Sequence, residues 1–198
     1  ALSAEDTGTR SVAIGEGALQ LQNNDNNNYN IAIGHHAGNL ITTGDQNTII
    51  GGLAGDSLLT GTNNVIIGYN AEASGTGAAD EITLGNANND TIRAAVQTIS
   101  SLSDERDKTN IQESTYGLDF IDKLNPVTFD WNTRDGSRKG KKDLGFIAQE
   151  LDAVDDEYTQ LVYKSNPDKL EASYGRLVPV LVKAIQELKA EIQELKTK

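Results

Sequence analysis

The feature that most constrains the fold is an internal repeat in the first half of the chain. The segment SVAIGEGAL (11–19) recurs as NIAIGHHAG (30–38), NTIIGGLAG (47–55) and NVIIGYNAE (64–72), with a weaker copy EITLGNA (81–87). The aligned glycines lie 19, 17, 17 and 17 residues apart, at Gly15, Gly34, Gly51, Gly68 and Gly85. A fixed period of this length is typical of proteins that stack one small structural unit many times.

Each unit predicts one short strand followed by a turn. Two large apolar or β-branched residues alternate with a small or apolar one, as Val12 and Ile14 do around Ala13, so such strands can be buried on both faces. The glycine that follows permits positive φ, and the Asn-rich linker 23–30 tolerates left-handed turns. Because one strand cannot bury itself, stacked copies, or copies from neighbouring chains, must complete the core.

The composition changes near Ser103, since residues 1–102 contain no Lys and no Pro. We therefore expect a β-repeat region over 1–102 and a second domain over 103–198. In the second domain the patterns predict a helix over 115–124, a strand over 126–131, a polar hairpin loop over 133–142, a strand turning into a helix over 143–154, and strands over 158–164 and 169–175.

A heptad pattern ends the chain. The apolar residues alternate spacings of three and four, and they are Val178, Leu181, Ile185, Leu188, Ile192 and Leu195. This a/d seam is short, so the helix needs partner helices. Ile at a with Leu at d favours a dimer. The fold class expected is thus an all-β repeat, a β-helix or β-roll-like stem, followed by a small α+β domain that ends in a coiled-coil helix.

The stretch SDERDKTNI (103–111) places Ser103 and Lys108 five residues apart, within a run of charges at the composition boundary. A chemically loaded stretch at such a boundary suggests processing of the chain. The plainer alternative is an exposed charged turn in which Ser103 caps a short helix.

Two resemblances sharpen these expectations. The repeat unit resembles the head repeats of trimeric bacterial adhesins, and similar units occur in phage tail fibres; this favours three chains over the dimer. The ordered segments SDERDKTNI, NPVTFDW, GFIAQEL and YGRLVPVLVKAIQELK resemble the C-terminal intramolecular chaperone domain of phage tail fibres and tailspikes, the auto-processing family called peptidase S74. The resemblance covers essentially 103–198. It implies a domain that trimerises and folds the fibre ahead of it and then releases itself by cutting at the Ser of its opening motif.

The functional pair of that family falls on Ser103 and Lys108, and the expected scissile bond is Leu102–Ser103. A lysine whose pKa is lowered by burial can take the proton of a serine hydroxyl, so the pair needs no histidine. Asp104 or Glu105 is expected to orient Lys108, and Arg106 or a backbone N–H to hold the oxyanion. One departure from the family pattern is Asp107, where many members carry an apolar residue.

Charge and composition limit the partners. The net charge of -12 argues against nucleic acid or an anionic membrane, and no apolar run is long enough to span a bilayer. The expected partners are two further copies of the chain, the upstream fibre segment of the same chain and a receptor on the host surface. The expected location is the virion, after synthesis in the host cytoplasm.

No cofactor or metal is expected. His35 and His36 are neighbours on a predicted strand, where adjacent side chains point to opposite faces. Two other functions remain open: a fibre that never cuts, whose C-terminal domain only nucleates assembly, and a carbohydrate-cleaving enzyme. The latter would need two carboxylates flanking a groove, and no acidic pair recurs with the repeat.

Overall fold

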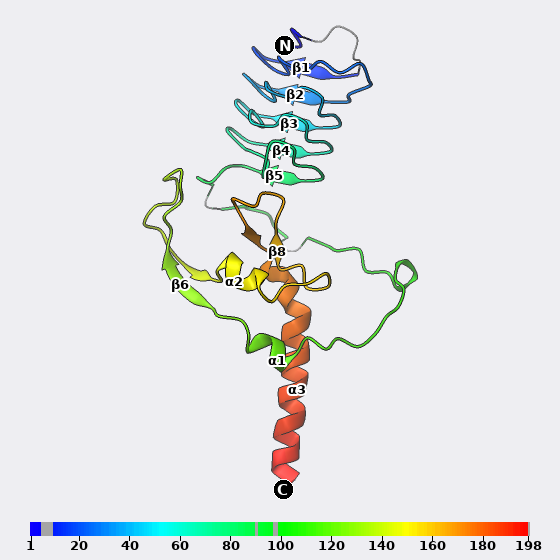
Figure 1. The fold of residues 1–198 in the computed structure, drawn as a ribbon, viewed down its shortest axis with the longest axis vertical. Helices are drawn as coiled ribbons and strands as arrows, with labels where there is room; N and C mark the ends of the chain where they lie inside the picture. The colour runs from blue at the N-terminus through cyan, green and yellow to red at the C-terminus, as the bar shows by residue number, and fades with distance from the viewer. Residues whose placement is uncertain (5–9, 90, 97–98, 198) are drawn as a thin grey trace. The chain divides into compact units, whose positions relative to one another are not determined.

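The computed structural model describes residues 1–4, 10–89, 91–96 and 99–197. The chain divides into two compact units, one formed by Ala1–Thr91 with Arg134–Arg138 and the other by Ile92–Thr133 with Lys139–Lys198. Figure 1 shows the elements of both, and each unit is described by itself below. The domain boundary expected between residues 102 and 103 stays a prediction.

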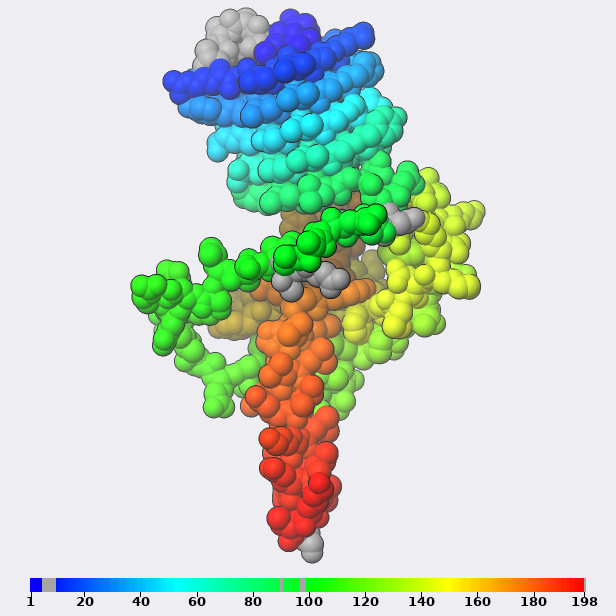
Figure 2. Space-filling model, turned by 180° about the vertical axis from the view of Figure 1, so that it is seen from behind, coloured from blue at the N-terminus to red at the C-terminus, as the bar shows by residue number. Residues whose placement is uncertain are grey.

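The first unit is a parallel β-solenoid with one short strand in each turn, which confirms the repeat interpretation. Its sheet follows chain order, and every strand pairs in parallel with the next, Val12 opposite Ile31 and Ile31 opposite Thr48. Figures 1 and 2 show the turns as successive layers. The strands are β1 (Val12–Ile14), β2 (Ile31–Ile33), β3 (Thr48–Ile50), β4 (Val65–Ile67) and β5 (Ile82–Leu84).

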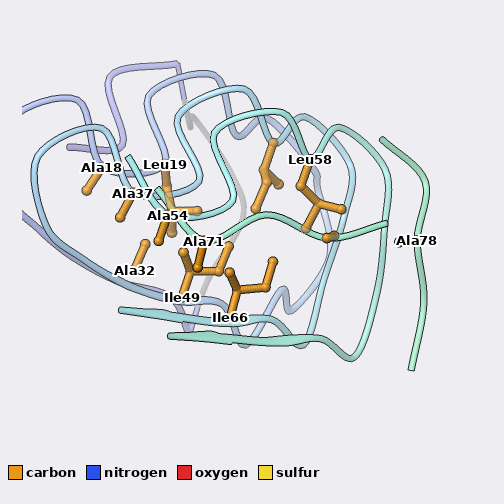
Figure 3. Packing of buried hydrophobic residues seen from close by; sticks show 12 residues of the cluster. Ala18, Leu19, Ala32, Ala37, Ile49, Ala54, Leu58, Ile66, Ala71 and Ala78 are labelled. Atoms are coloured by element: carbon orange, nitrogen blue, oxygen red, sulfur yellow. The ribbon is translucent and has the colours of Figure 1, made fainter. Parts of the chain in front are cut away.

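The residue at the centre of each strand points into the solenoid. Ala32, Ile49 and Ile66 are fully buried, and small residues from the turns stack beside them, as Figure 3 shows for Ala37 and Ala54. The flanking apolar residues of the same strands lie on the other face and stay partly exposed within one chain. Only one face of the sheet is therefore buried by the chain's own coils.

The repeated glycine is required by a close approach between turns. Gly51 has φ +139°, and a Cβ there would lie 2.3 Å from the carbonyl oxygen of Gly68 in the next turn. No larger residue fits such a gap or adopts this backbone conformation without strain. The period of the glycines thus marks the point where successive turns touch through their backbones.

A ladder of buried asparagines runs along the interior, a role that the sequence expectation of asparagine turns did not include. Asn30, Asn47 and Asn64 are essentially fully buried just before their strands. Asn47 Nδ2 donates to Asn30 Oδ1 (3.1 Å) and to the Gly61 carbonyl (2.9 Å), while its Oδ1 accepts the backbone N–H of Asn64 (3.1 Å). The side-chain amides therefore satisfy backbone groups that water cannot reach.

The second unit is a small α+β arrangement, as expected. Its elements are the 3₁₀ turn η1 (Glu105–Asp107), α1 (Leu118–Ile121), β6 (Val127–Asp130), β7 (Lys142–Gly145), α2 (Ala148–Asp152), β8 (Val162–Tyr163), β9 (Glu171–Ala172), the 3₁₀ turn η2 (Tyr174–Arg176) and α3 (Leu177–Thr197). The antiparallel pair β6–β7 confirms the predicted hairpin. Helix α1 is shorter than the predicted 115–124, because Gly117 immediately precedes it and Pro126 follows soon after.

Helix α3 presents two apolar faces. Leu177, Val180 and Ala184 are buried in a core shared with Phe120 of α1 and Leu151 of α2. The heptad residues lie exposed on another face, and Figure 2 shows the lower part of this helix in red. Among the described residues, no helix combines the length and the apolar character needed to cross a membrane.

Candidate functional site

The candidate site lies in the turn at the start of the predicted chaperone segment. Asp104 caps the 3₁₀ turn η1, its Oδ1 accepting the backbone N–H of Arg106 at 2.9 Å. Two backbone bonds close the turn, Asp107 N–H to the Asp104 carbonyl (3.2 Å) and Lys108 N–H to the Glu105 carbonyl (3.1 Å). The plainer sequence alternative is thus half right: an exposed charged turn is present, but its cap is Asp104 and not Ser103.

The turn brings the two residues of the predicted pair into contact. Lys108 Nζ lies 2.7 Å from Ser103 Oγ and 3.1 Å from the carbonyl oxygen of Ser103. Both distances are those of good hydrogen bonds. Since five residues separate the two side chains, the contact depends on the conformation of the turn. The catalytic roles of these two residues stay predictions.

The site is open to solvent within one chain. Leu102, which contributes the expected scissile carbonyl, is 100% exposed, and Ser103, Glu105 and Lys108 are exposed as well. In the described chain η1 packs against no other helix or strand, and Lys108 lies exposed to water. A substrate peptide bond in this position is accessible and unconstrained by a fixed strand or helix.

Two of the proposed supporting residues, Asp104 and Arg106, bind each other. Arg106 chelates the Asp104 carboxylate through two parallel bonds, Nε to Oδ1 (2.9 Å) and Nη2 to Oδ2 (2.6 Å). The side-chain hydrogen bonds from Arg106 lower the pKa of Asp104, and the same pair raises the pKa of Arg106. In this structure the Asp104 carboxylate therefore binds Arg106, and the supporting roles expected for Asp104, Glu105 and Arg106 stay predictions.

Two further titratable groups were not singled out from the sequence. In the solenoid, burial raises the pKa of Glu72 to about 7, with the Ser57 hydroxyl and the nearby Asp56 also acting on it. In the second unit, the Tyr116 hydroxyl donates to Asp156 Oδ2 and its pKa rises to about 12. Both depend on contacts between residues far apart in sequence, which carry no local signal.

The histidine pair differs from the expectation of opposite faces. His35 and His36 follow strand β2 in a turn, with His36 at φ +56°, and their rings stack with centroids 4.1 Å apart. Within the part of the chain that the structure describes, no group of three or more His, Cys, Asp or Glu side chains is placed to hold a metal ion.

Comparison with known proteins found a family match for residues 103–163. Residues 103–163 match the Peptidase_S74 family model, described as chaperone of endosialidase, a family associated with self-cleavage. The matched range contains the first three segments quoted above and ends before YGRLVPVLVKAIQELK. The match supports a chaperone domain of this family that begins at Ser103 and follows the β-solenoid in the chain. Neither the curated proteins nor the solved structures gave a match.

Proposed function

We propose that this chain is the distal part of a phage tail fibre or tailspike, whose C-terminal domain drives trimerisation and folding and then cuts itself free at Leu102–Ser103. The observation that carries the proposal is the 2.7 Å contact between Lys108 Nζ and Ser103 Oγ within a segment that matches the chaperone family. The assembled fibre belongs to the virion, where it would meet a receptor on the host surface.

The chemistry requires Lys108 to lose its proton first, because an ammonium group can only donate hydrogen bonds. The neutral amine then accepts the hydroxyl proton of Ser103, and Oγ attacks the carbonyl carbon of Leu102. The C–N bond to Ser103 breaks as its nitrogen takes the proton back from Lys108. Water hydrolyses the resulting ester, leaving a carboxylate on Leu102 and a free hydroxyl and amino group on Ser103.

Assembly supplies what a single chain lacks at this site. Shielding Nζ from water favours the uncharged amine, and within one chain Lys108 is exposed. We expect packing of the copies to provide that shielding, so that cutting follows assembly. An unassembled chain would then keep its chaperone, which is the order of events a folding aid needs.

Two exposed apolar surfaces support association with further copies of the same chain. The first is the outer stripe of the solenoid sheet, with the exposed residues Val12, Ile14, Ile31, Ile33, Ile50, Ile67, Ile82 and Leu84. The second is the heptad seam of α3, with Val178, Leu181, Ile185, Leu188, Ile192 and Leu195. Both repeat along an element at a fixed spacing, as an interface between parallel identical chains requires. Contiguous apolar patches of this kind mark interaction surfaces.

The need for a folding aid follows from the first surface. Strands of three residues with an exposed apolar stripe are prone to incorrect pairing before the correct partners meet. A C-terminal domain that holds three chains together would raise the local concentration of the solenoids and set their register. Once the solenoids have packed, cutting Leu102–Ser103 breaks none of the contacts between their strands.

The test is a denaturing gel and mass spectrum of freshly expressed full-length protein. We expect two fragments near half length, with the new ends at Leu102 and Ser103. Ser103→Ala should leave a whole, folded chain of 21.2 kDa. Lys108→Ala should also stay whole, and Lys108→Arg should not restore cutting, since arginine cannot act as a base at working pH.

Other outcomes would redirect the proposal. Fragments of unchanged size and yield from Ser103→Ala would remove Ser103 as the nucleophile. A wild-type chain that assembles but stays whole would favour the non-cleaving fibre, in which the C-terminal domain only nucleates assembly.

A further inference from the structure

The turn that carries the candidate site contains three carboxylates close in sequence to the Lys108 amine. Asp104 directly follows the nucleophile, and Glu105 and Asp107 lie within the turn itself. A carboxylate that paired with Lys108 would hold Nζ away from Ser103 Oγ and would stabilise the ammonium form, which cannot act as a base. A working site therefore has to keep these charges from the amine.

Arg106 binds one of these three carboxylates, that of Asp104. Its guanidinium uses Nε and Nη2 to bind both oxygens of Asp104, at 2.9 and 2.6 Å, while its backbone N–H donates to the same carboxylate. Bidentate pairs of this kind fix geometry as well as charge. The Arg106 side chain is 88% exposed, so the pair contributes to no core, and its effect is confined to the turn.

We infer that Arg106 is a positioning residue for the cleavage: it occupies the Asp104 carboxylate, so that Asp104 caps the turn without pairing with Lys108, and Lys108 Nζ stays on Ser103 Oγ. This assignment rests on the proposed cleavage by Ser103 and Lys108. It also gives Asp104 a definite task, because the same carboxylate accepts the Arg106 backbone N–H in the turn that returns Lys108 to Ser103.

The pH dependence of cleavage distinguishes this positioning role from a purely structural role. The titratable or charged groups on the segment that faces Lys108 are Asp104, Glu105, Arg106 and Asp107, and no other helix or strand of the described chain packs against η1. Removing the Arg106 cation frees Asp104, which then favours the protonated amine of Lys108. The cleavage should consequently require a higher pH. Removing Asp104 as well takes away that competitor, so the required pH should fall back.

The experiment uses full-length protein made by cell-free synthesis. Synthesis is stopped, the mixture is diluted into buffers from pH 6 to pH 10, and the fraction cut is followed with time on denaturing gels. A native gel run in parallel reports the assembled fraction, to which each rate is normalised. The variants are Arg106→Gln, Arg106→Lys and the double variant Asp104→Asn with Arg106→Gln. Lys139→Gln in the exposed hairpin loop is the control for loss of one positive charge elsewhere.

We expect Arg106→Gln to raise the pH of half-maximal cutting by about one unit, equivalent to a rate about tenfold lower on the rising limb. The double variant should return that midpoint to the wild-type value, because Asn keeps a capping oxygen without the charge. The pH midpoint of Arg106→Lys should lie between those of the wild type and Arg106→Gln. Lysine keeps the positive charge but cannot bind both carboxylate oxygens through two parallel N–H groups. Lys139→Gln should match the wild type.

Two results would overturn the assignment while leaving the proposed cleavage intact. One is an Arg106→Gln variant that cuts as the wild type does at every pH. The other is a variant that cuts more slowly at every pH with an unmoved midpoint, which would make Arg106 an oxyanion donor or a structural residue. A wild-type chain that assembles and stays whole at every pH overturns the proposed cleavage and this assignment together.

Discussion

Replacing Asn47 by Ala tests how the solenoid interior is held together. The Asn47 side chain is fully buried and links three turns, through Asn30 on one side and Gly61 and Asn64 on the other. In the Ala variant the Asn47 backbone N–H keeps its bond to Asn30 Oδ1 (2.9 Å), and Asn64 Nδ2 keeps its bond to the Ala78 carbonyl (2.8 Å). The Gly61 carbonyl and the Asn64 backbone N–H lose the partners that Asn47 gave them.

Each buried backbone group left without a partner costs about 1–3 kcal/mol, so losing two partners should lower the local opening free energy by about 2–6 kcal/mol. Because tenfold in an equilibrium constant is about 1.4 kcal/mol, amide exchange in peptides containing Asn64 should accelerate by about 30-fold or more. Hydrogen-exchange mass spectrometry of the full-length protein measures this directly. It also avoids a single unfolding midpoint, which a chain of two units does not define.

The matched control is Asn23→Ala, an exposed asparagine of the linker before β2. A surface change of this kind should stay within about 0.5 kcal/mol. If Asn47→Ala behaves like Asn23→Ala, then the buried ladder contributes no net stability and the reasoning from unsatisfied backbone groups is wrong.

Three further predictions follow from other parts of the molecule. Burial raises the pKa of Glu72 from 4.5 to about 7, so its contribution to stability is complete below about pH 4.5 and is lost as the pH rises to about 7. Glu72→Gln should flatten this pH dependence in amide exchange at Asp56 and Ser57, and an unchanged pH profile would contradict the prediction. Gly51→Ala should prevent the turns from stacking, and rapid proteolysis of the solenoid should report this. Gly75→Ala should resist proteolysis as well as the wild type does, because Gly75 has no positive φ and an added Cβ would meet open space. Equal resistance of both variants would mean that the close approach to Gly68 can relax. Leu188→Asp on the exposed heptad seam should shift the protein towards smaller species in analytical ultracentrifugation, and Gln186→Asp, on the same helix but off the seam, should not; if neither changes the mass, α3 does not hold the copies together.

The sequence determined the repeat and its consequences because these depend on local spacing. Glycines at a period of 17 residues, each after a short apolar alternation, require a backbone turn at the same place in every unit, and identical units stack in register. The order of helices and strands in the second unit was likewise predictable from apolar periodicity and from Pro126. Ser103 and Lys108 could be singled out as a candidate pair because their motif lies within nine consecutive residues.

The tertiary structure decided which side of each strand is inside and which groups meet across turns. Alternation in Ile31–Ile33 is the same whichever face is buried, and only the closure of the coil makes Ala32 an interior residue and leaves its neighbours exposed. Asparagine is a typical turn residue, yet the Asn30–Asn47–Asn64 ladder lies in the core. It does so because the buried backbone of a narrow coil needs side-chain donors. At the candidate site, spacing alone could not tell whether Asp104 would face Lys108 or Arg106. The capped turn settles it, because one carboxylate receives both the backbone N–H and the guanidinium of Arg106.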